Sequence, residues 1–458
     1  MEDNLELEMI DEPHLPVGDN SLPPVIREIV GNAPQNRKLP AFVASLAPLC
    51  ALATRVRLKY FYDTRPSALL LQVIIEGNQS VGKSFAADIE RLIMDSTLRE
   101  RDTEQRRLEQ EYREKRRRRR ANDRLEDEPR TTIRVIPATI SKTVLTRRTD
   151  FHERVLGGML TFWMFAEELA QVTDAGRQGY SNLRTIMRTA YDLGSRFGMD
   201  FASDNSYSAI VDINICSMFC TTPAALDDYM DNQAVEGGNI TRCIPCRLND
   251  SIGEDGAMFV PYSTMQLKLI GDILQSIMND TYAPDGTLMP EIALDMSWLD
   301  LTVRDWCRQK GHEATLTGST ALDVFRKRSS VSAFRIAALC YYLYGKEGVT
   351  SQDERRERCR DIYLFMAEYV LQGLLSRWGR RFEELNIKRN IQNVFRRRRG
   401  IFELLGQEFT RDELKNIVSQ RELTTPARVF IHKWKQAGDI TPIDGDRFRK
   451  SECYLQAA

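Results

Sequence analysis

The sequence lacks any long hydrophobic run. In this chain of 458 residues no apolar stretch reaches the length of about 18 residues that a transmembrane helix needs. The first residues, MEDNLELEMIDEPH, are acidic and do not show the basic-then-apolar pattern of a secretory signal. We therefore expect a cytoplasmic protein with no membrane partner.

The chain also has almost no net charge. Its 64 Lys and Arg residues nearly balance 65 Asp and Glu residues, which gives a formal net charge of −1. The molecule as a whole is therefore not a basic nucleic-acid binder. Its charge is uneven, however, because residues 116–120 and 396–399 are basic runs, and such local runs can bind phosphates.

Histidine is scarce, with four residues, and the nine cysteines are an odd number scattered along the chain. We expect reduced thiols, as is usual in a cytosolic protein. The pairs Cys216 and Cys220, and Cys243 and Cys246, have spacings that would suit a zinc site. Both pairs lie in apolar, strand-like segments, so buried core thiols are favoured over a metal site.

What the sequence does contain is a phosphate-binding motif. The segment IIEGNQSVGKSFAADIERL occupies residues 74–92, and its GNQSVGKS portion fits G-x-x-x-x-G-K-[ST]. In such a loop backbone N–H groups turn toward the phosphates, Lys83 reaches the β- and γ-phosphates, and Ser84 holds Mg²⁺. A predicted strand precedes the motif and a predicted helix follows it, which adds the positive end of a helix dipole. The residues predicted to bind the nucleotide are Gly77, Asn78, Gln79, Ser80, Val81, Gly82, Lys83 and Ser84.

The hydrophobic pattern around the motif predicts an α/β core with a parallel sheet. Strands are expected at residues 56–62, 69–76, 131–136, 158–166, 209–220 and 242–248. Helices are expected at residues 84–98, 141–148, 183–193, 321–344 and 363–378. Strands that alternate with helices are typical of a parallel sheet covered on both faces.

Changes in composition predict the domain boundaries. We expect a flexible acidic tail (1–20), an N-terminal helical segment (21–55), a P-loop ATPase domain (56–260), a helical domain (261–399) and a winged helix-turn-helix (400–458). The last domain is predicted from a helix, a second helix capped by Thr410, a third helix opened by Thr424-Thr425-Pro426, and two short strands around Asp444-Gly445.

A charged segment, residues 98–129, interrupts the predicted ATPase domain and has almost no apolar face. We predict a long helix or a helical hairpin that stops at Pro129. A solvated helix with ion pairs between residues i and i+4 is the favoured interpretation. A nucleic-acid or subunit contact through residues 116–120 is the alternative.

Two carboxylates follow the apolar segment at residues 162–166. ATP hydrolysis requires an acid at the end of a strand that neighbours the phosphate loop. We predict that Glu167 binds Mg²⁺ or its water shell and that Glu168 polarises the attacking water. The alternative is that both are exposed glutamates at the start of a helix, where the helix dipole favours them. This pair on one strand favours an AAA+-like strand order over a RecA-like one.

Other polar residues fall where strands end or begin. Thr221 is predicted to sense the γ-phosphate or to position the water, whereas Thr222 would cap the following helix. Arg242 follows a Gly-Gly turn and is predicted to reach the γ-phosphate on a neighbouring subunit as an arginine finger. A surface ion pair is the alternative for Arg242. Arg328 or Arg335 could close over the nucleotide as a lid, although helix-surface charge is the favoured interpretation.

These motifs, in this order, resemble a known group of proteins. GNQSVGKS, a strand ending in Glu-Glu, a strand ending in Thr-Thr-Pro, Gly-Gly-x-x-x-Arg and a helix with Arg-x-Ala-Ala are similar to the primase-helicase-like P-loop family of bacterial mobile elements, plasmids and phages. More distantly they resemble superfamily-three helicases and AAA+ proteins. The resemblance covers residues 22–400, and the positions that match are Lys83, Ser84, Glu167, Glu168 and Arg242.

The resemblance implies an oligomeric, hexameric ATPase that uses ATP and Mg²⁺ and acts on DNA during replication of a mobile element. The long insertion at 98–129 departs from the family pattern. No acidic cluster of a primase polymerase domain is present in the chain, so a separate primase or another mobile-element protein would supply priming.

Two functions remain open. The first is a DNA motor or helicase on single-stranded or forked DNA, with pore-facing residues among Lys142, Arg147, Arg148 and Arg196-Phe197, and with phosphate contacts from Arg421, Arg428, Lys433 and Lys435. The second is a DNA-triggered regulatory, assembly or defence ATPase that switches without unwinding. A nucleotide kinase is disfavoured, because it would need a compact lid and its own substrate pocket.

Overall fold

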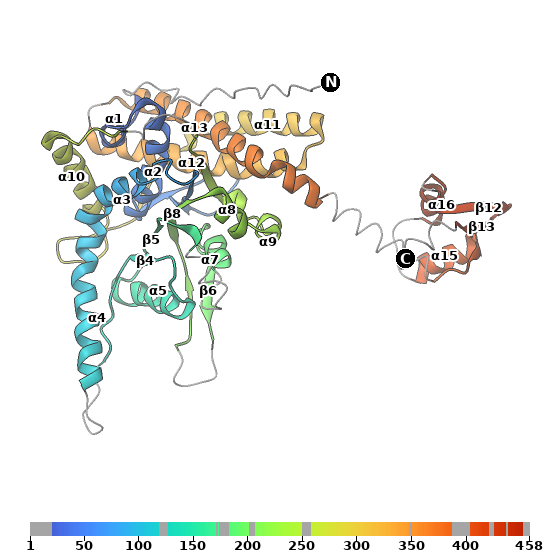
Figure 1. Cartoon of the computed structure of the whole chain (residues 1–458), viewed down its shortest axis with the longest axis horizontal. Helices are drawn as coiled ribbons and strands as arrows, with labels where there is room; N and C mark the ends of the chain where they lie inside the picture. The colour runs from blue at the N-terminus through green and yellow to red at the C-terminus, as the bar shows by residue number, and fades with distance from the viewer. Residues whose placement is uncertain are drawn as a thin grey trace. The chain divides into compact units, whose positions relative to one another are not determined.

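The computed structural model describes residues 21–118, 127–170, 173, 183–200, 207–249, 258–348, 350–386, 404–420, 426–436 and 438–451. The chain divides into two compact units, Met1–Phe382 and Glu383–Ala458 (Figure 1). The predicted acidic tail, the basic run at 396–399, and Arg119, Arg120, Arg421, Thr424 and Thr425 lie outside the described residues.

Five parallel strands form the main sheet of the first unit. In sheet order they are β4 (Val135–Pro137), β5 (Phe162–Ala166), β8 (Ile215–Thr221), β3 (Gln72–Glu76) and β9 (Cys243–Arg247). Every adjacent pair is parallel, and each residue of β3 and β8 is buried. Such continuous burial is expected for a parallel sheet covered on both faces. The predicted parallel α/β core is thus confirmed.

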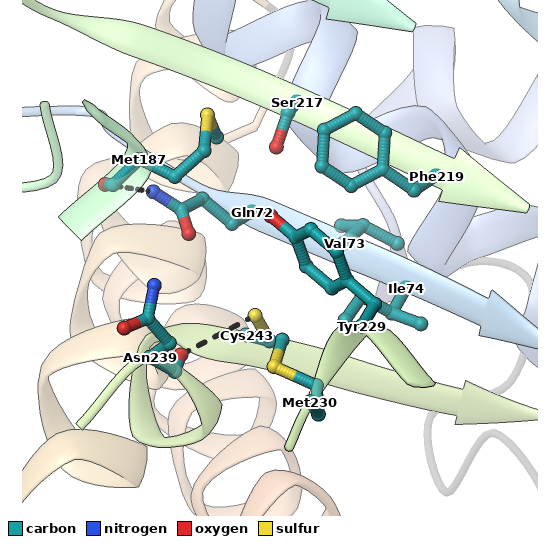
Figure 2. Close-up of a pocket in the computed structure, with 10 residues that line it drawn as sticks. All are labelled: Gln72, Val73, Ile74, Met187, Ser217, Phe219, Tyr229, Met230, Asn239 and Cys243. Carbon is teal, nitrogen blue, oxygen red and sulfur yellow. Dashed lines mark hydrogen bonds between the residues drawn. The ribbon is translucent and has the colours of Figure 1, made fainter. Parts of the chain in front are cut away.

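Helices cover both faces of this sheet. The buried helix α2 (Lys38–Leu52) contacts β3, β5, β8 and β9, and it also packs on α3 (Phe85–Met94). Gln72, Ile74, Ser217 and Phe219 share the opposite face, where α7 (Leu183–Thr189) and α8 (Pro223–Tyr229) lie (Figure 2).

That second face contains a small cavity of about 10 Å³ (Figure 2). Gln72 Nε2 donates to the carbonyl oxygen of Met187 at 2.7 Å beside it. The Ser217 hydroxyl, also on its wall, has no hydrogen-bond partner among the described residues. A volume of this size has room for about one water molecule, so it belongs to the core and cannot hold a nucleotide.

The other described helices of this unit are α1 (Pro24–Gly31), α4 (Glu100–Arg118), α5 (Lys142–Leu156), α9 (Asn232–Glu236), α10 (Thr264–Asn279), α11 (Asp300–Thr317), α12 (Thr320–Glu347) and α13 (Gln352–Leu374). Short 3₁₀ or π segments are η2 (Gln35–Arg37), η3 (Asp95–Arg99), η4 (Ile240–Arg242), η5 (Ser297–Leu299) and η6 (Leu375–Gly379). A small sheet joins β10 (Ile292–Ala293), β1 (Val56–Leu58) and β2 (Ser67–Ala68). The helix predicted at 84–98 therefore continues, through η3, into the charged helix α4.

The single strand predicted at residues 209–220 is wrong. The segment forms two strands, β7 (Ala209–Asp212) and β8, and β7 pairs in antiparallel fashion with β6 (Arg196–Met199). Between them the chain changes partners, because Ile213 N donates to Ser195 O at 3.3 Å while Asn214 O accepts from Phe162 N at 2.9 Å. The result is a hairpin inserted directly before β8.

The second unit has its own small sheet and core. Its described elements are β11 (Glu408–Thr410), α15 (Arg411–Gln420), α16 (Ala427–Gln436), β12 (Ile440–Asp444) and β13 (Arg447–Lys450), with sheet order β11-β13-β12. Phe409, Trp434 and Phe448 are buried in its core. The Thr410 hydroxyl accepts from Glu413 N at 3.2 Å while the Glu413 carboxylate accepts from Thr410 N at 2.8 Å. This reciprocal pair is a capping box, so the predicted N-cap is confirmed.

Candidate nucleotide-binding site

The GNQSVGKS loop connects β3 to α3, and its two glycines are required by its shape. A Cβ atom on Gly77 would lie 2.6 Å from Val81 Cγ1, closer than real Cβ atoms approach, and 3.2 Å from Leu248 Cβ, which is a tight contact. Gly82 adopts φ +79°, a left-handed conformation that favours glycine. Ser80 also has a positive φ, 64°, although it carries a side chain. Such strain in a non-glycine residue commonly occurs at ligand-binding loops.

The loop presents backbone donors that lack partners. The N–H groups of residues 79–82 donate no hydrogen bond to any residue that the structure describes. The loop then leads into α3, where Ala86 N already donates to Lys83 O at 3.1 Å and Ala87 N to Ser84 O at 2.9 Å, so the unpartnered amides are those of the loop itself. Successive amides of this kind, together with the helix dipole, form a concave site for an anion.

Lys83 lies across this concave loop. Its Nζ donates to the carbonyl oxygens of Gly77 at 2.7 Å and Asn78 at 2.5 Å. These acceptors are neutral, so a phosphate oxygen would compete for the ammonium with a stronger, charge-assisted hydrogen bond. The lysine is therefore positioned to bind an anion held by the loop amides.

The carboxyl ends of three strands meet at this loop. The register pairs Glu76 with Thr221 and Ala166 with Phe219, and Gly77 N donates to Thr221 O at 3.1 Å. Continuing the register by one residue places Glu167 beside Cys220. One strand, β8, lies between β3 and the acid-bearing strand β5.

The charges of Lys83 and Glu167 both influence the thiol of Cys220. Burial raises the pKa of Cys220 to about 12, while the nearby Lys83 ammonium lowers this pKa and the Glu167 carboxylate raises it. Both charges therefore act on the same end of β8. Burial likewise raises the pKa values of Cys216 and Cys243 to about 12 and of Cys246 to about 11. The prediction of buried core thiols at these four positions is confirmed.

Glu167 and Glu168 are both exposed at the end of β5. The Glu167 carboxylate accepts from Arg91 Nη2 at 3.4 Å, and Arg91 also pairs with Asp88 of α3 at 2.9 Å. Ser84 is exposed as well, at the point where α3 begins. A serine hydroxyl and a carboxylate are hard oxygen ligands of the kind that Mg²⁺ prefers, so these residues fit the ion.

Thr221 lies at this edge but is buried, with 2% of its surface exposed. Its hydroxyl donates to the carbonyl oxygen of Thr222 at 3.0 Å, so in this conformation it does not point into the loop. Thr222 accepts from Ala225 N at 3.4 Å and precedes Pro223, the first residue of α8. The capping role considered for Thr222 is therefore present in the structure.

Arg242 lies at the opposite, amino-terminal edge of the sheet, in η4 directly before β9. Its Nη1 donates to Gly238 O at 2.9 Å, and its Nη2 lies 3.8 Å from the Asp192 carboxylate. Burial lowers the pKa of Arg242, and the neighbouring Arg328 guanidinium lowers it further. Arg242 therefore cannot reach a nucleotide in the loop of its own chain.

Arg328 and Arg335 of α12 lie at this same amino-terminal edge. Arg335 is buried and donates to Leu70 O at 2.9 Å, Tyr191 O at 3.1 Å and Ser67 Oγ at 3.1 Å. Leu70 precedes β3, whereas the loop follows β3. The possibility that one of these arginines closes over the same chain's nucleotide is therefore wrong.

Sequence reasoning missed an arginine that does lie beside the loop. Arg377 of η6 pairs with Glu76, the last residue of β3, at 3.0 Å, and with Asp227 at 3.0 Å. Burial raises the pKa of the Glu76 carboxyl, and the guanidinium of Arg377 opposes that rise. A second arginine, Arg37, donates to Val81 O at 3.1 Å within the loop. For the pair of Glu76 and Arg377, the one signal in the sequence was that Glu76 is a charged residue at the end of an otherwise apolar strand.

The charged helix α4 is anchored at its base. The buried carboxylate of Asp102 accepts from Arg134 N at 2.9 Å and Val135 N at 2.7 Å. Farther along, Glu109 pairs with the buried Arg148 at 2.9 Å, so Arg148 is not available as a pore-facing residue. The predicted i, i+4 ion pairs occur on the exposed face, for example between Glu109 and Arg113 at 3.4 Å. Residues 116–118 are exposed at the far end of α4.

Two further groups of basic residues are exposed. At the β6–β7 hairpin Arg196 is exposed, whereas Phe197 is buried beneath Lys142, whose Nζ lies 5.1 Å from the ring centroid. In the second unit Arg428, His432 and Lys435 are exposed at positions i, i+4 and i+7 of α16. This spacing places the three side chains on one face of the helix, which we call the basic face of α16.

No known family model matches the chain, and a search of curated proteins finds no significant match. Within the described ranges, no helix combines the length and the apolar character that crossing a bilayer demands.

Proposed function

We propose that this chain is an ATP-hydrolysing, oligomeric DNA motor or helicase of AAA+-like type. The observation that carries the proposal is the loop at 77–84, where four amides without a partner among the described residues and the Lys83 ammonium precede α3. A nucleoside triphosphate with Mg²⁺ supplies the anion that such a loop accommodates.

The sheet supports the AAA+-like part of the proposal. One strand, β8, separates the loop strand β3 from the acid-bearing strand β5, and β9 lies on the other side of β3. This is the strand order expected for an AAA+-like core. The same order supports the resemblance to the primase-helicase-like family of mobile elements.

In the proposed reaction the loop amides and Lys83 hold the β- and γ-phosphates. Ser84 and Glu167 would hold Mg²⁺, which supplies positive charge to the phosphate oxygens. Glu168 polarises a water whose oxygen bonds to the γ-phosphorus while the bond to the β–γ bridging oxygen breaks, giving ADP and phosphate. Arg242 would act from a second copy of the chain, because it lies at the opposite edge of its own sheet.

Two features support action on DNA. The β6–β7 hairpin precedes β8 and carries the exposed Arg196, so it is the structural candidate for a pore-facing segment. The order β11-α15-α16-β12-β13 in the second unit supports a winged helix, and the basic face of α16 would suit the phosphates and base edges of a duplex groove. Lys433, also on α16, was predicted to join these contacts.

The experiment is the ATPase rate without DNA, with single-stranded DNA, with forked DNA and with duplex DNA. Glu168→Gln should abolish the rate, while Glu153→Gln, an exposed glutamate of α5, should not change it. Strong stimulation by DNA supports the motor. A DNA-independent rate that still requires Glu168 favours the regulatory or defence switch, and no hydrolysis under any condition overturns the proposal.

A further inference from the structure

Arginines gather around a single carboxylate at the amino-terminal edge of the sheet. Asp192 lies 3.8 Å from Arg242 Nη2, 3.7 Å from Arg328 Nη1 and 3.7 Å from Arg335 Nη2. We call these residues, together with Tyr191, the arginine cluster. Three guanidiniums therefore share one carboxylate, at distances longer than a good charge-assisted hydrogen bond.

The same guanidiniums surround the buried ring of Tyr191. Their Cζ atoms lie 5.8 Å, 5.9 Å and 4.3 Å from its centroid for Arg242, Arg328 and Arg335. The Nε atoms of Arg242 and Arg335 are buried without a hydrogen-bond partner among the described residues. An unpaired buried donor of this kind is costly, so the cluster is both positively charged and short of acceptors.

The cluster is open on one side. The side chains of Arg335 and Arg242 are 3% and 14% exposed, whereas those of Arg328 and Asp192 are 33% and 44% exposed. An anion can therefore approach past Arg328, and the first group that it meets is Asp192. Because both carry negative charge, the anion and Asp192 compete for the same guanidiniums.

A nucleotide in the chain's own loop cannot supply this anion. Arg335 is bonded to Leu70 O, and the loop begins at Gly77. Seven residues of extended chain span roughly 23 Å at about 3.3 Å per residue. The anion must come from another molecule.

We propose that Asp192 is the internal counter-ion of the arginine cluster, and that the terminal phosphate of a nucleotide bound to a second copy of this chain displaces it. This inference rests on the proposed function, and it adds Asp192, Arg328 and Arg335 to the role predicted for Arg242. A contact between the loop edge of one copy and the cluster edge of the next is heterologous, and such contacts close into rings when the rotation allows. Asp192 thus keeps the arginines neutralised until a loaded neighbour arrives.

The first test measures binding of inorganic pyrophosphate by calorimetry to full-length Lys83→Ala, in which the loop is weakened. Adding Arg328→Ala should weaken the remaining binding at least tenfold, and adding Asp192→Asn should tighten it several-fold. The matched controls are Arg308→Ala and Asp305→Asn, an exposed pair on α11 with an N–O distance of 3.4 Å, which should change nothing. Thermal melts check that each variant folds. Binding that is indifferent to both cluster variants would overturn the anion site.

The second test asks where the phosphate comes from. Lys83→Ala retains the cluster but not the loop, and Arg328→Ala retains the loop but not the cluster. A mixture should hydrolyse ATP faster than the sum of the two variants alone, because composite sites form between copies. A purely additive mixture would overturn the second-copy source while leaving the pyrophosphate result intact. Absence of ATPase activity in the wild type would instead count against the proposed function.

Discussion

The two edges of the main sheet handle charge in different ways. At the carboxyl-terminal edge the phosphate loop is exposed, its donors are backbone amides, and its acids are the exposed Glu167 and Glu168. At the amino-terminal edge the donors are side chains, partly buried, and they are held by one internal carboxylate. The first edge is arranged to receive an anion directly, whereas the second must first release Asp192.

The two edges also depend on different contacts for their stability. The loop edge depends on glycine geometry and on the pairing of Glu76 with Arg377, which fix the end of β3. The cluster edge depends on Arg335, which ties α12 to the start of β3 and to Tyr191. Variants at the two edges should therefore separate catalysis, stability and assembly.

The largest effect is expected from Glu168→Gln. Loss of the group that polarises water should lower kcat by about 10²- to 10⁴-fold, which is typical of a general base. The KM for ATP should hardly change, because the loop still binds the phosphates. Asp192→Asn, at the other edge, should change the rate only a few-fold. Steady-state kinetics on both variants measures the contrast, and equal losses would contradict the division of roles.

The next largest effect, on the free energy of unfolding, is expected from Arg377→Ala. The change leaves the buried Glu76 carboxylate without its partner, and removal of one member of such a pair costs about 3 kcal/mol. Arg381→Ala is the matched control, since Arg381 donates to Asn232 Oδ1 at 2.9 Å and Met230 O at 3.0 Å and lies 4.0 Å from the exposed Asp227 carboxylate, so its loss leaves no buried carboxylate unpaired. Chemical denaturation measures both free energies of unfolding. Equal losses would show that the Glu76 pair does not stabilise the end of β3.

A smaller effect is expected from Gly77→Ala. The new Cβ would lie 2.6 Å from Val81 Cγ1, so the loop must shift, with a cost of about 1–3 kcal/mol as in other overpacked sites. Affinity for ATP should fall as well. Gly31→Ala provides the control, because a Cβ there meets nothing within 4 Å. If both variants bind ATP and melt like the wild type, the loop is not as tightly shaped as the structure indicates.

The smallest effect is a change in pH dependence from Glu76→Gln. Burial raises the folded-state pKa of Glu76 above its unfolded value, so its stabilising contribution is complete below the unfolded pKa and is lost as pH rises through the folded pKa. The wild type should therefore lose more thermal stability than the variant between pH 4.5 and pH 7.5. Thermal melts across that range check the slope. Parallel curves of melting temperature against pH for the wild type and the variant would mean that Arg377 fully offsets the effect of burial on the pKa of Glu76.

Local patterns predicted much of the loop edge and, in the second unit, the cap of α15. The glycines and lysine of the loop, the apolar strands and the Thr410 cap depend on residues within one turn or one strand, and these features are present. The sequence also placed two carboxylates at the end of β5. Each of these signals is carried by residues that are neighbours along the chain.

Contacts between distant segments could not be predicted in the same way. The pairing of Glu76 with Arg377 joins residues 301 positions apart, and the arginine cluster brings η4 and α12 to one carboxylate. The insertion of β8 between β3 and β5 is also a property of the whole sheet. Hydrophobic periodicity reports which face of a segment is buried, but not which distant segment covers it.

The most direct test of the central claim is a calorimetric titration of ATP, with Mg²⁺, into the wild type and into Lys83→Ala. We expect ATP to bind the loop of the variant about 10- to 100-fold more weakly than that of the wild type, because a charge-assisted hydrogen bond to phosphate contributes roughly 1.5–3 kcal/mol. Arg308→Ala should bind like the wild type. Equal affinity in the wild type and in Lys83→Ala, or no binding to the wild type, would contradict the assignment of residues 77–84 as the nucleotide site.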